Sequence, residues 1–319
     1  MPEAEGRDLS VERRHLPVAA RIESFTFRGD RAALLAACRG ADAILTDYVP
    51  FDRAVLGALE GCRLISVAAT GWDCVDVAAA AERGIRVAAV GEYCTDEVAD
   101  HTLALLLALE RRLLDYHRQV QERHSWRWND VTGIRRLAGQ SLGLVGFGRI
   151  GQAVARRALG FGLAVLAADP RVAADVVRHH GAEPVTLDAL LARADIVSLH
   201  CNLDSTSRGL MNRAAFAKME RRPRLINVAR GGLVVEADLA DALDAGRLAG
   251  AALDVLAEDS PDLGHHPLVG RGDVILTPHV AFYSEAALED LRRISAENIR
   301  AFLEGRPNDV FRLVPAAAP

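Results

Sequence analysis

The chain has 319 residues, of which half are hydrophobic and a quarter charged, and its formal net charge is −5. This composition is typical of a globular protein with room for one large or two ordinary domains. The charge shows no basic stripe and the longest apolar run, 103–109, is far too short to cross a bilayer, so we expect neither a nucleic-acid nor a membrane partner.

Five cysteines are scattered along the chain and never form a CxxC pair. An odd number without paired spacing favours free thiols in a reducing compartment over disulfides or a zinc site. The histidine pairs at 179–180 and 265–266 have no further ligand at a recognisable spacing, so we expect solvated side chains and no metal. The first residues are polar and carry no apolar signal core, and we expect a cytoplasmic protein.

The regular elements follow a simple alternation. No clear apolar run precedes the segment 21–27, so the N-terminal edge stays undefined at this stage. From residue 63 onward, short β-branched or leucine-rich runs alternate with alanine-rich stretches of helical period, which predicts parallel sheet covered by helices on both faces. The predicted strands lie at 63–68, 85–90, 141–146, 163–169, 195–200, 224–229, 249–255 and 273–278.

Two long helical stretches, 95–120 and 284–305, bracket the middle of the chain. Helices in these places are natural crossings between an inserted domain and an outer domain built from both chain ends. The sequence therefore predicts an α/β protein with two Rossmann-like, doubly wound domains. We expect one domain at 1–100 with 286–319, and an inserted cofactor domain at 101–285.

The strongest local signal is a glycine-rich turn. Gly146, Gly148 and Gly151 form GxGxxG directly after an apolar run and at the start of a helical stretch. In a dinucleotide site the first glycine permits the turn, the second lets the backbone approach the pyrophosphate, and the third lets helix and strand pack closely. The amides of Arg149 and Ile150 then face the phosphates at the helix N-terminus.

The strand after this helix ends in Asp169, 18 residues beyond Gly151. A carboxylate there accepts hydrogen bonds from the ribose hydroxyls and repels a 2′-phosphate, which favours NAD over NADP. Arg171 lies two residues further on and keeps NADP open as an alternative.

Three later strand ends carry reactive side chains: Arg230, then Asp254 with Glu258 and Asp259, then His279. Because ligands of open α/β sheets bind at the carboxyl ends of strands, we expect these groups to converge. His279 alone could be a buried core histidine, a metal ligand or a catalytic acid. A cofactor strand, an anion clamp and a carboxylate partner favour the catalytic acid.

The motifs "LVGFGRIG", "NVARGGLV", "GAALDV" and "TPHVA" occur in this order. Together they resemble the D-2-hydroxyacid dehydrogenase family over essentially the whole chain. "YCTDEVADHTLALLLALERR" and "TPHVAFYSE" are most similar to the branch of the C-terminal binding proteins, which are NAD-dependent corepressors. The resemblance implies NAD as cofactor, a flavodoxin-like substrate domain, and hydride transfer between a 2-oxo acid and a D-2-hydroxy acid.

In this resemblance Arg230 clamps the substrate's carboxylate and carbonyl, and His279 protonates the carbonyl oxygen as hydride arrives. The family pairs this histidine with a glutamate five residues after the aspartate of "LDV". Here that position is Asp259, one methylene shorter, and Glu258 is the alternative partner. Both carboxylates could also be solvated loop charges.

A small anionic substrate is implied by a further loop, in which the family uses backbone amides that match Thr70 and Gly71. The C-terminal binding proteins carry an arginine where this chain has Val67, so one charged contact is missing. Phe282 falls at the position of a pocket tryptophan and is either an apolar pocket wall or ordinary core. The remaining cofactor contacts implied by position are Thr102, His200, Cys201, Val228, Ala229 and Asp254.

Trp126 and Trp128 follow the first long helix, in a region through which family members dimerise. We expect a homodimer, with a hydrophobic cap over the site as the alternative. Two other functions stay open at this stage: an NAD(H)-sensing, corepressor-like protein with little turnover, and a dehydrogenase acting on a phosphorus oxoanion or phosphonate.

Overall fold

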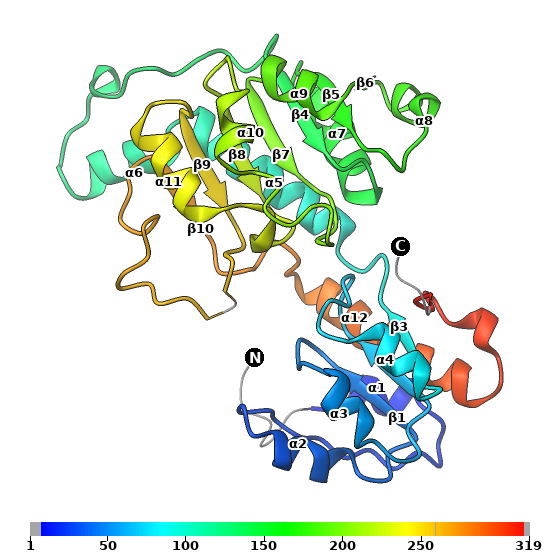
Figure 1. Cartoon of the computed structure of the whole chain (residues 1–319). Helices are drawn as coiled ribbons and strands as arrows, with labels where there is room; N and C mark the ends of the chain where they lie inside the picture. Colours follow the sequence, from blue (N-terminus) through cyan, green and yellow to red (C-terminus); the bar gives the residue numbers. More distant parts are fainter. Residues whose placement is uncertain (1–7, 259, 316–319) are drawn as a thin grey trace. The chain divides into compact units, whose positions relative to one another are not determined.

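The structure, a computed structural model, describes residues 8–258 and 260–315. It divides the chain into two compact units, Met1–Tyr93 with Ser284–Pro319, and Cys94–Tyr283 (Figure 1). The division expected after residue 100 falls inside α5 (Thr95–Glu110), which lies whole in the second unit. This helix packs along α7 (Arg149–Gly160) and against strands of the second unit, so it cannot be cut at its middle.

The first unit is built on a three-stranded parallel sheet, in the order β1-β2-β3. The strands are β1 (Ala43–Thr46), β2 (Leu64–Val67) and β3 (Arg86–Ala89). Residues 21–28 form no strand, so the undefined N-terminal edge is an irregular segment. The helices of this unit are α1 (Ser10–His15), α2 (Arg31–Cys38), α3 (Arg53–Gly57), α4 (Val77–Glu82), α12 (Glu285–Leu303) and η3 (Pro307–Asp309).

The C-terminal helix α12 completes the first unit. Its Ser284 cap accepts a hydrogen bond from the Ala287 amide, and the helix ends shortly before Gly305, as the sequence predicts. It lies against β2, where the Ser66 hydroxyl donates to the Ser295 carbonyl at 3.1 Å. Both chain ends therefore contribute to one core.

The second unit contains a seven-stranded parallel sheet in the order β10-β9-β8-β7-β4-β5-β6. Its strands are β4 (Ser141–Val145), β5 (Ala164–Ala168), β6 (Glu183–Pro184), β7 (Ile196–Leu199), β8 (Arg224–Asn227), β9 (Gly250–Leu253) and β10 (Val274–Leu276). Every predicted run contains a strand, and the predicted α/β fold with parallel sheets is confirmed. Strands β5 and β6 lie on one side of β4 and strands β7 to β10 on the other, which makes the carboxyl end of β4 the switch point of a doubly wound sheet.

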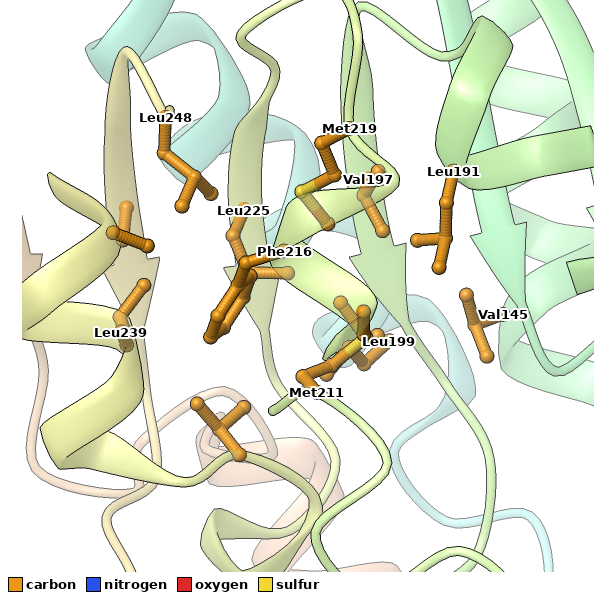
Figure 2. Packing of buried hydrophobic residues seen from close by; sticks show 14 of the residues in the cluster. Val145, Leu191, Val197, Leu199, Met211, Phe216, Met219, Leu225, Leu239 and Leu248 are labelled. Atoms are coloured by element: carbon orange, nitrogen blue, oxygen red, sulfur yellow. The ribbon is translucent and has the colours of Figure 1, made fainter. Parts of the chain in front are cut away.

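Helices cover both faces of this sheet (Figure 1). α5 and α7 pack on one side, and α9 (Leu187–Arg193), α10 (Arg213–Ala217) and α11 (Glu236–Asp244) on the other. Figure 2 shows the second side, where Phe216, Leu225 and Leu239 belong to one cluster of buried hydrophobic side chains. The remaining helices are α6 (Leu113–Gln121), α8 (Ala174–His179), η1 (Trp128–Asp130) and η2 (Gly231–Leu233).

The single helix predicted at 95–120 is wrong, because the chain forms α5 and α6 with a break between them. Arg112 adopts a left-handed conformation, φ 54°, which ends one helix and starts the next. Its Nε lies 2.6 Å from the Asp115 carboxylate, an ion pair within the first turn of α6.

Candidate active site

The carboxyl ends of six neighbouring strands, β10, β9, β8, β7, β4 and β5, lie along one edge of the second sheet. Most of the site residues that we expect in this unit come directly after one of these strands. The parallel order therefore brings together the glycine-rich turn, Asp169, Arg230, Asp254 and His279 at one edge, as open α/β sheets do with their ligands.

Two glycines of the turn after β4 are required by space. Gly146 has φ +94°, and a Cβ there would lie 2.5 Å from the Cys201 backbone nitrogen. A Cβ on Gly151 would lie 2.5 Å from the Gly146 carbonyl oxygen. These contacts join the turn to the end of β7 and pack α7 tightly against its own strand.

Gly148 differs from the other two, because a Cβ there would meet nothing within 4 Å. It caps α7, whose first backbone bond runs from the Gln152 amide to the Gly148 carbonyl at 2.9 Å. In the first turn of the helix, Arg149 is exposed and Ile150 is half-buried. The empty space beside Gly148 thus lies at a helix N-terminus, where an anion is favoured.

Asp169 follows β5 and is already oriented by the backbone. Its Oδ2 accepts from the Phe147 amide at 2.7 Å and its Oδ1 from the Arg171 amide at 2.8 Å. Each carboxylate oxygen has a second lone pair, so the side chain can still accept from two hydroxyls.

His200 and Cys201 follow β7 and back the glycine-rich turn. The Ser198 hydroxyl lies 2.8 Å from His200 Nε2, whereas the buried Nδ1 has no hydrogen-bond partner. Burial lowers the His200 pKa from 6.5 to about 3 and, as the main cause, raises the Cys201 pKa to about 11. Both side chains are therefore uncharged near neutral pH.

Thr102 is fully buried in α5, and its hydroxyl donates to the Val98 carbonyl at 2.7 Å. This is the bond that a threonine inside a helix commonly makes.

The loop after β8 is shaped by Asn227, a fully buried side chain. Its Oδ1 accepts from the Ala229 amide at 3.1 Å, and its Nδ2 donates to the Arg230 carbonyl at 2.9 Å. Val228 is buried, and Ala229 and Arg230 are half-buried. The guanidinium of Arg230 donates to the Ala229 carbonyl through Nη1 at 2.9 Å, which holds its stem against the loop.

Gly231 joins this loop to the one after β9. A Cβ at Gly231 would lie only 1.8 Å from the Leu256 carbonyl oxygen, so the two backbones touch. The segment beyond Leu256 carries Glu258, which is exposed. Asp259, the expected partner of His279, lies outside the described residues.

Asp254 is fully buried at the end of β9 and organises the next loop. Its Oδ1 accepts from the Thr277 hydroxyl at 2.5 Å and the Val280 amide at 2.9 Å, and its Oδ2 accepts from the Ala281 amide at 2.9 Å. Its carbonyl also accepts from the His279 amide at 2.7 Å. The aspartate thus fixes the turn on both sides of His279.

His279 is half-buried and has φ 52°, a left-handed conformation that few residues other than glycine adopt. Strain of this kind is common at active sites when the surrounding bonds enforce it, as the Asp254 bonds do here. The Phe282 ring stands edge-on to the imidazole, with 6.2 Å between the ring centroids. The structure therefore brings Phe282 next to His279.

His101, on α5, is a further member of this group that the sequence reasoning missed. Its Nε2 lies 3.2 Å from the Thr277 hydroxyl and 3.6 Å from Asp254 Oδ1. Because the Thr277 proton is directed at Asp254, the hydroxyl oxygen accepts from His101. In the sequence, His101 and Thr277 are marked only by their places in the quoted motifs "YCTDEVADHTLALLLALERR" and "TPHVA".

A second missed contact holds the loop after β9. Glu236, at the start of α11, accepts from the Ala257 amide at 2.7 Å and pairs with His266 Nε2 at 3.1 Å. The His266 side chain is only 10% exposed, so the expectation that it is solvated is wrong, whereas the His265 side chain is 89% exposed. Glu236 clamps both ends of the segment that carries Glu258.

Thr70 and Gly71 lie in the first unit, shortly after β2, and are half-buried. They are not part of the group gathered on the second sheet.

Among the described residues, no three His, Cys, Asp or Glu side chains are arranged to hold a metal ion. No helix within residues 8–258 and 260–315 is long and apolar enough to span a bilayer. The residues present do fit a dinucleotide: the open space at Gly148, the helix N-terminus behind it and the oriented carboxylate of Asp169 match pyrophosphate and ribose.

Known proteins resemble this chain in sequence and in fold. A sequence model described as D-isomer specific 2-hydroxyacid dehydrogenase, NAD binding domain, matches residues 103–281. A hydroxypyruvate reductase of Blautia hydrogenotrophica is 36% identical over 276 residues, which cover 85% of this chain and 84% of that protein. A D-3-phosphoglycerate dehydrogenase of Mycobacterium tuberculosis is 38% identical over 277 residues, 86% of this chain and 52% of that longer protein.

A D-lactate dehydrogenase of Aquifex aeolicus, solved with NAD and lactic acid, superposes with a TM-score of 0.82. It is 28% identical, and the match covers 88% of each chain. The expected family is therefore confirmed, and the chain belongs to the D-isomer-specific 2-hydroxyacid dehydrogenases, the NAD-dependent oxidoreductases of 2-hydroxy acids.

Proposed function

We propose that Arg230 and His279 carry out the reaction of this NAD-dependent 2-hydroxyacid dehydrogenase, in which a 2-oxo acid and a D-2-hydroxy acid are interconverted. The main support is the close approach of Gly231 to Leu256. This contact brings the loop after β8, which carries Arg230, against the loop after β9, which carries Glu258. The Asp254 side chain, at the end of β9, also holds the turn that carries His279. NADH, when bound, supplies the hydride.

Arg230 binds and orients the substrate. Its guanidinium offers donors in a planar fork that fits a carboxylate and a neighbouring carbonyl oxygen. The bonds of Asn227 fix the backbone from which it reaches out. Phe282, whose ring stands edge-on to the imidazole, excludes water beside it.

His279 holds the proton that the substrate's carbonyl oxygen receives as C2 accepts hydride. In the opposite direction, the imidazole takes the hydroxyl proton. Asp259, or Glu258 in its place, stabilises the imidazolium. The left-handed turn at His279 fixes the direction in which the ring projects.

The cofactor lies over the glycine-rich turn in this proposal. The amides of Arg149 and Ile150 face the pyrophosphate, and Asp169 accepts from the adenosine ribose. Val228, Ala229, His200 and Cys201 form the apolar, uncharged wall behind it.

The test is the rate of NADH oxidation at 340 nm over a panel of 2-oxo acids and oxo-phosphonates, with His279→Ala and the exposed His179→Ala as matched variants. We expect turnover of a 2-oxo acid that falls at least about 100-fold in His279→Ala and persists in His179→Ala. Equal rates in the wild type and His279→Ala would remove the histidine from the mechanism. Tight NADH binding without turnover on any acid would favour the sensor function, which the comparisons do not favour.

We infer that two copies of this chain associate through the segment around η1. The indoles of Trp126 and Trp128 are 88% and 84% exposed. Their backbone is nevertheless fixed to α6, since Tyr116 donates to the Trp128 carbonyl at 2.7 Å and Gln119 to the Arg127 carbonyl at 2.6 Å. Rigid, exposed tryptophans are typical interface anchors.

Light scattering after gel filtration tests this association. We expect a dimer mass for the wild type and a monomer for Trp126→Ala/Trp128→Ala, with exposed Phe25→Ala unchanged as control. A monomeric wild type at micromolar concentration would contradict the proposal.

A reducing compartment is the further proposal for where the protein works. All five cysteines lie among the described residues and none forms a disulfide, and three of them are buried. We expect the unfolding midpoint to be the same with and without a reducing agent; a lower midpoint under reduction would point to a disulfide and to another compartment.

A further inference from the structure

Three charged side chains meet at the end of β5 and β7. Asp169 follows β5, and its Oδ1 accepts from the Arg171 amide at 2.8 Å. The guanidinium of Arg171 turns away toward the loop after β7, where its Nη2 lies 2.6 Å from Asp204 Oδ2. Asp204 thus holds Arg171, a cation beside Asp169, in an ion pair.

Asp204 is a fixed carboxylate and not a loose surface charge. Its Oδ1 accepts from the Thr206 amide at 2.8 Å, the Thr206 hydroxyl at 2.6 Å and the Ser207 amide at 3.1 Å. These bonds use one oxygen and leave the other for Arg171. Hydrogen bonds from Thr206 and Arg171 hold the pKa of Asp204 well below its usual range, so it is ionised at any working pH.

Arg171 joins the two carboxylates, through its backbone amide to Asp169 and through its guanidinium to Asp204. Cys201 is influenced by the charges of all three, and its backbone nitrogen lies against Gly146 of the glycine-rich turn. Two carboxylates and one guanidinium give this place a net charge of −1. A nucleotide 2′-phosphate carries roughly −1.5 to −2 at neutral pH and is repelled by such a field.

We propose that Asp204 is a second determinant of cofactor specificity: it engages Arg171, which would otherwise bind a 2′-phosphate, and so makes the chain select NAD(H) over NADP(H). This inference rests on the proposed placement of Asp169 at the adenosine ribose. Without Asp204, the free guanidinium would lie next to Asp169 and offset its repulsion of the phosphate. Asp169 and Arg171 are two residues apart in the sequence, whereas Asp204 is 33 residues beyond Arg171 and reaches it only through the fold.

The test is the dissociation constant of NADH and of NADPH, measured by nicotinamide fluorescence without substrate. Asp204→Asn keeps an oxygen for the Thr206 and Ser207 bonds and removes only the charge that holds Arg171. We expect it to lower the ratio of the NADPH to the NADH dissociation constant about tenfold, as one gained charge-assisted bond to phosphate permits.

Two further variants separate this role from general electrostatics. Arg171→Ala added to Asp204→Asn must abolish the gain, because the guanidinium provides it. Asp175→Asn removes one exposed carboxylate that pairs with Arg178 instead, so the ratio must stay at the wild-type value.

The outcomes are distinguishable. An unchanged ratio in Asp204→Asn, or a gain that survives without Arg171, overturns the role of Asp204 while NADH binding by the wild type upholds the cofactor site. A wild type that binds no NADH overturns the cofactor site and this inference with it.

Discussion

The hydroxyl of Thr277 and the carboxylate of Asp254 are joined by a 2.5 Å hydrogen bond in the turn that precedes His279. His101 completes the group by approaching the same hydroxyl. In its proposed role as catalytic acid, His279 needs such support, since the strain of its left-handed backbone would otherwise relax. We therefore assign Thr277 and His101 to the positioning of His279.

Thr277→Val removes the hydroxyl at nearly constant volume. We expect it to lower the free energy of unfolding by about 1–2 kcal/mol, because the buried Asp254 loses a donor, and to reduce kcat more than it raises KM. Thr277→Ser keeps the hydroxyl and is expected to restore both. Urea unfolding and steady-state kinetics provide the measurements, and a Ser variant as impaired as Val would contradict the role of the hydroxyl.

Glu236 is expected to hold the loop after β9, residues 256–266, in place without touching substrate. Glu236→Ala releases both the Ala257 amide and His266, so the segment between them opens more often. We expect faster protease cleavage and amide exchange within residues 256–266 and a lower kcat. Asp241→Ala, on the same helix α11 and mostly exposed, is the control and is expected to behave as wild type. Unchanged amide exchange in Glu236→Ala would show that Glu236 does not hold this loop in place.

Alanine substitutions at Gly148, which caps α7, and at Gly160, at the end of α7, distinguish an effect on ligand binding from an effect on stability. A Cβ meets nothing within 4 Å at either position. Gly148→Ala is expected to fold with wild-type stability but to bind NADH at least about tenfold more weakly, since its methyl group occupies the space for pyrophosphate. Gly160→Ala is expected to bind NADH normally. Equal affinities in the two variants would move the phosphate site away from Gly148.

The decrease of the free energy of unfolding at acidic pH is expected to depend on His200. Its pKa is about 3 in the folded protein and about 6.5 when unfolded, so the unfolded chain binds the proton more readily. Stability is therefore lost progressively as the pH falls below about 6.5, because the unfolded chain takes up a proton that the folded chain does not bind until about pH 3. His200→Gln is expected to flatten this slope in urea titrations between pH 7 and 5, and exposed His179→Gln is not. Parallel profiles for wild type and His200→Gln would refute the buried neutral imidazole.

The sequence predicted the second unit well because its signals are local. Apolar runs of four or five residues mark buried parallel strands, and the spacing of Gly146, Gly148 and Gly151 reflects contacts within one turn and its neighbour. The strand β6 escaped prediction because it is only two residues long, and β1 because its residues are merely half-buried for the most part.

The contacts that position the site could not be predicted in the same way. Thr277 and Asp254 are 23 residues apart, Glu236 and His266 are 30 apart, and Arg171 and Asp204 are 33 apart. Each pair joins loops that follow neighbouring or nearby strands, so it depends on the strand order, which one sequence does not specify. The break at Arg112 was missed for another reason, since arginine ordinarily favours helix and only its φ of 54° reveals the end.

Arg230→Lys tests the anion clamp by keeping the charge and removing the planar fork. Lysine provides a point charge in place of two parallel donors, so one of the two bonds to substrate is lost. We expect kcat/KM to fall about 10- to 100-fold, mainly through a higher KM, and NADH affinity to stay within about twofold. Arg208→Lys, on the neighbouring loop but with no assigned role, is the control. A lysine variant with wild-type kcat/KM would show that the guanidinium does not bind the carboxylate, and the substrate anion would then have to be held by amides such as those of Thr70 and Gly71.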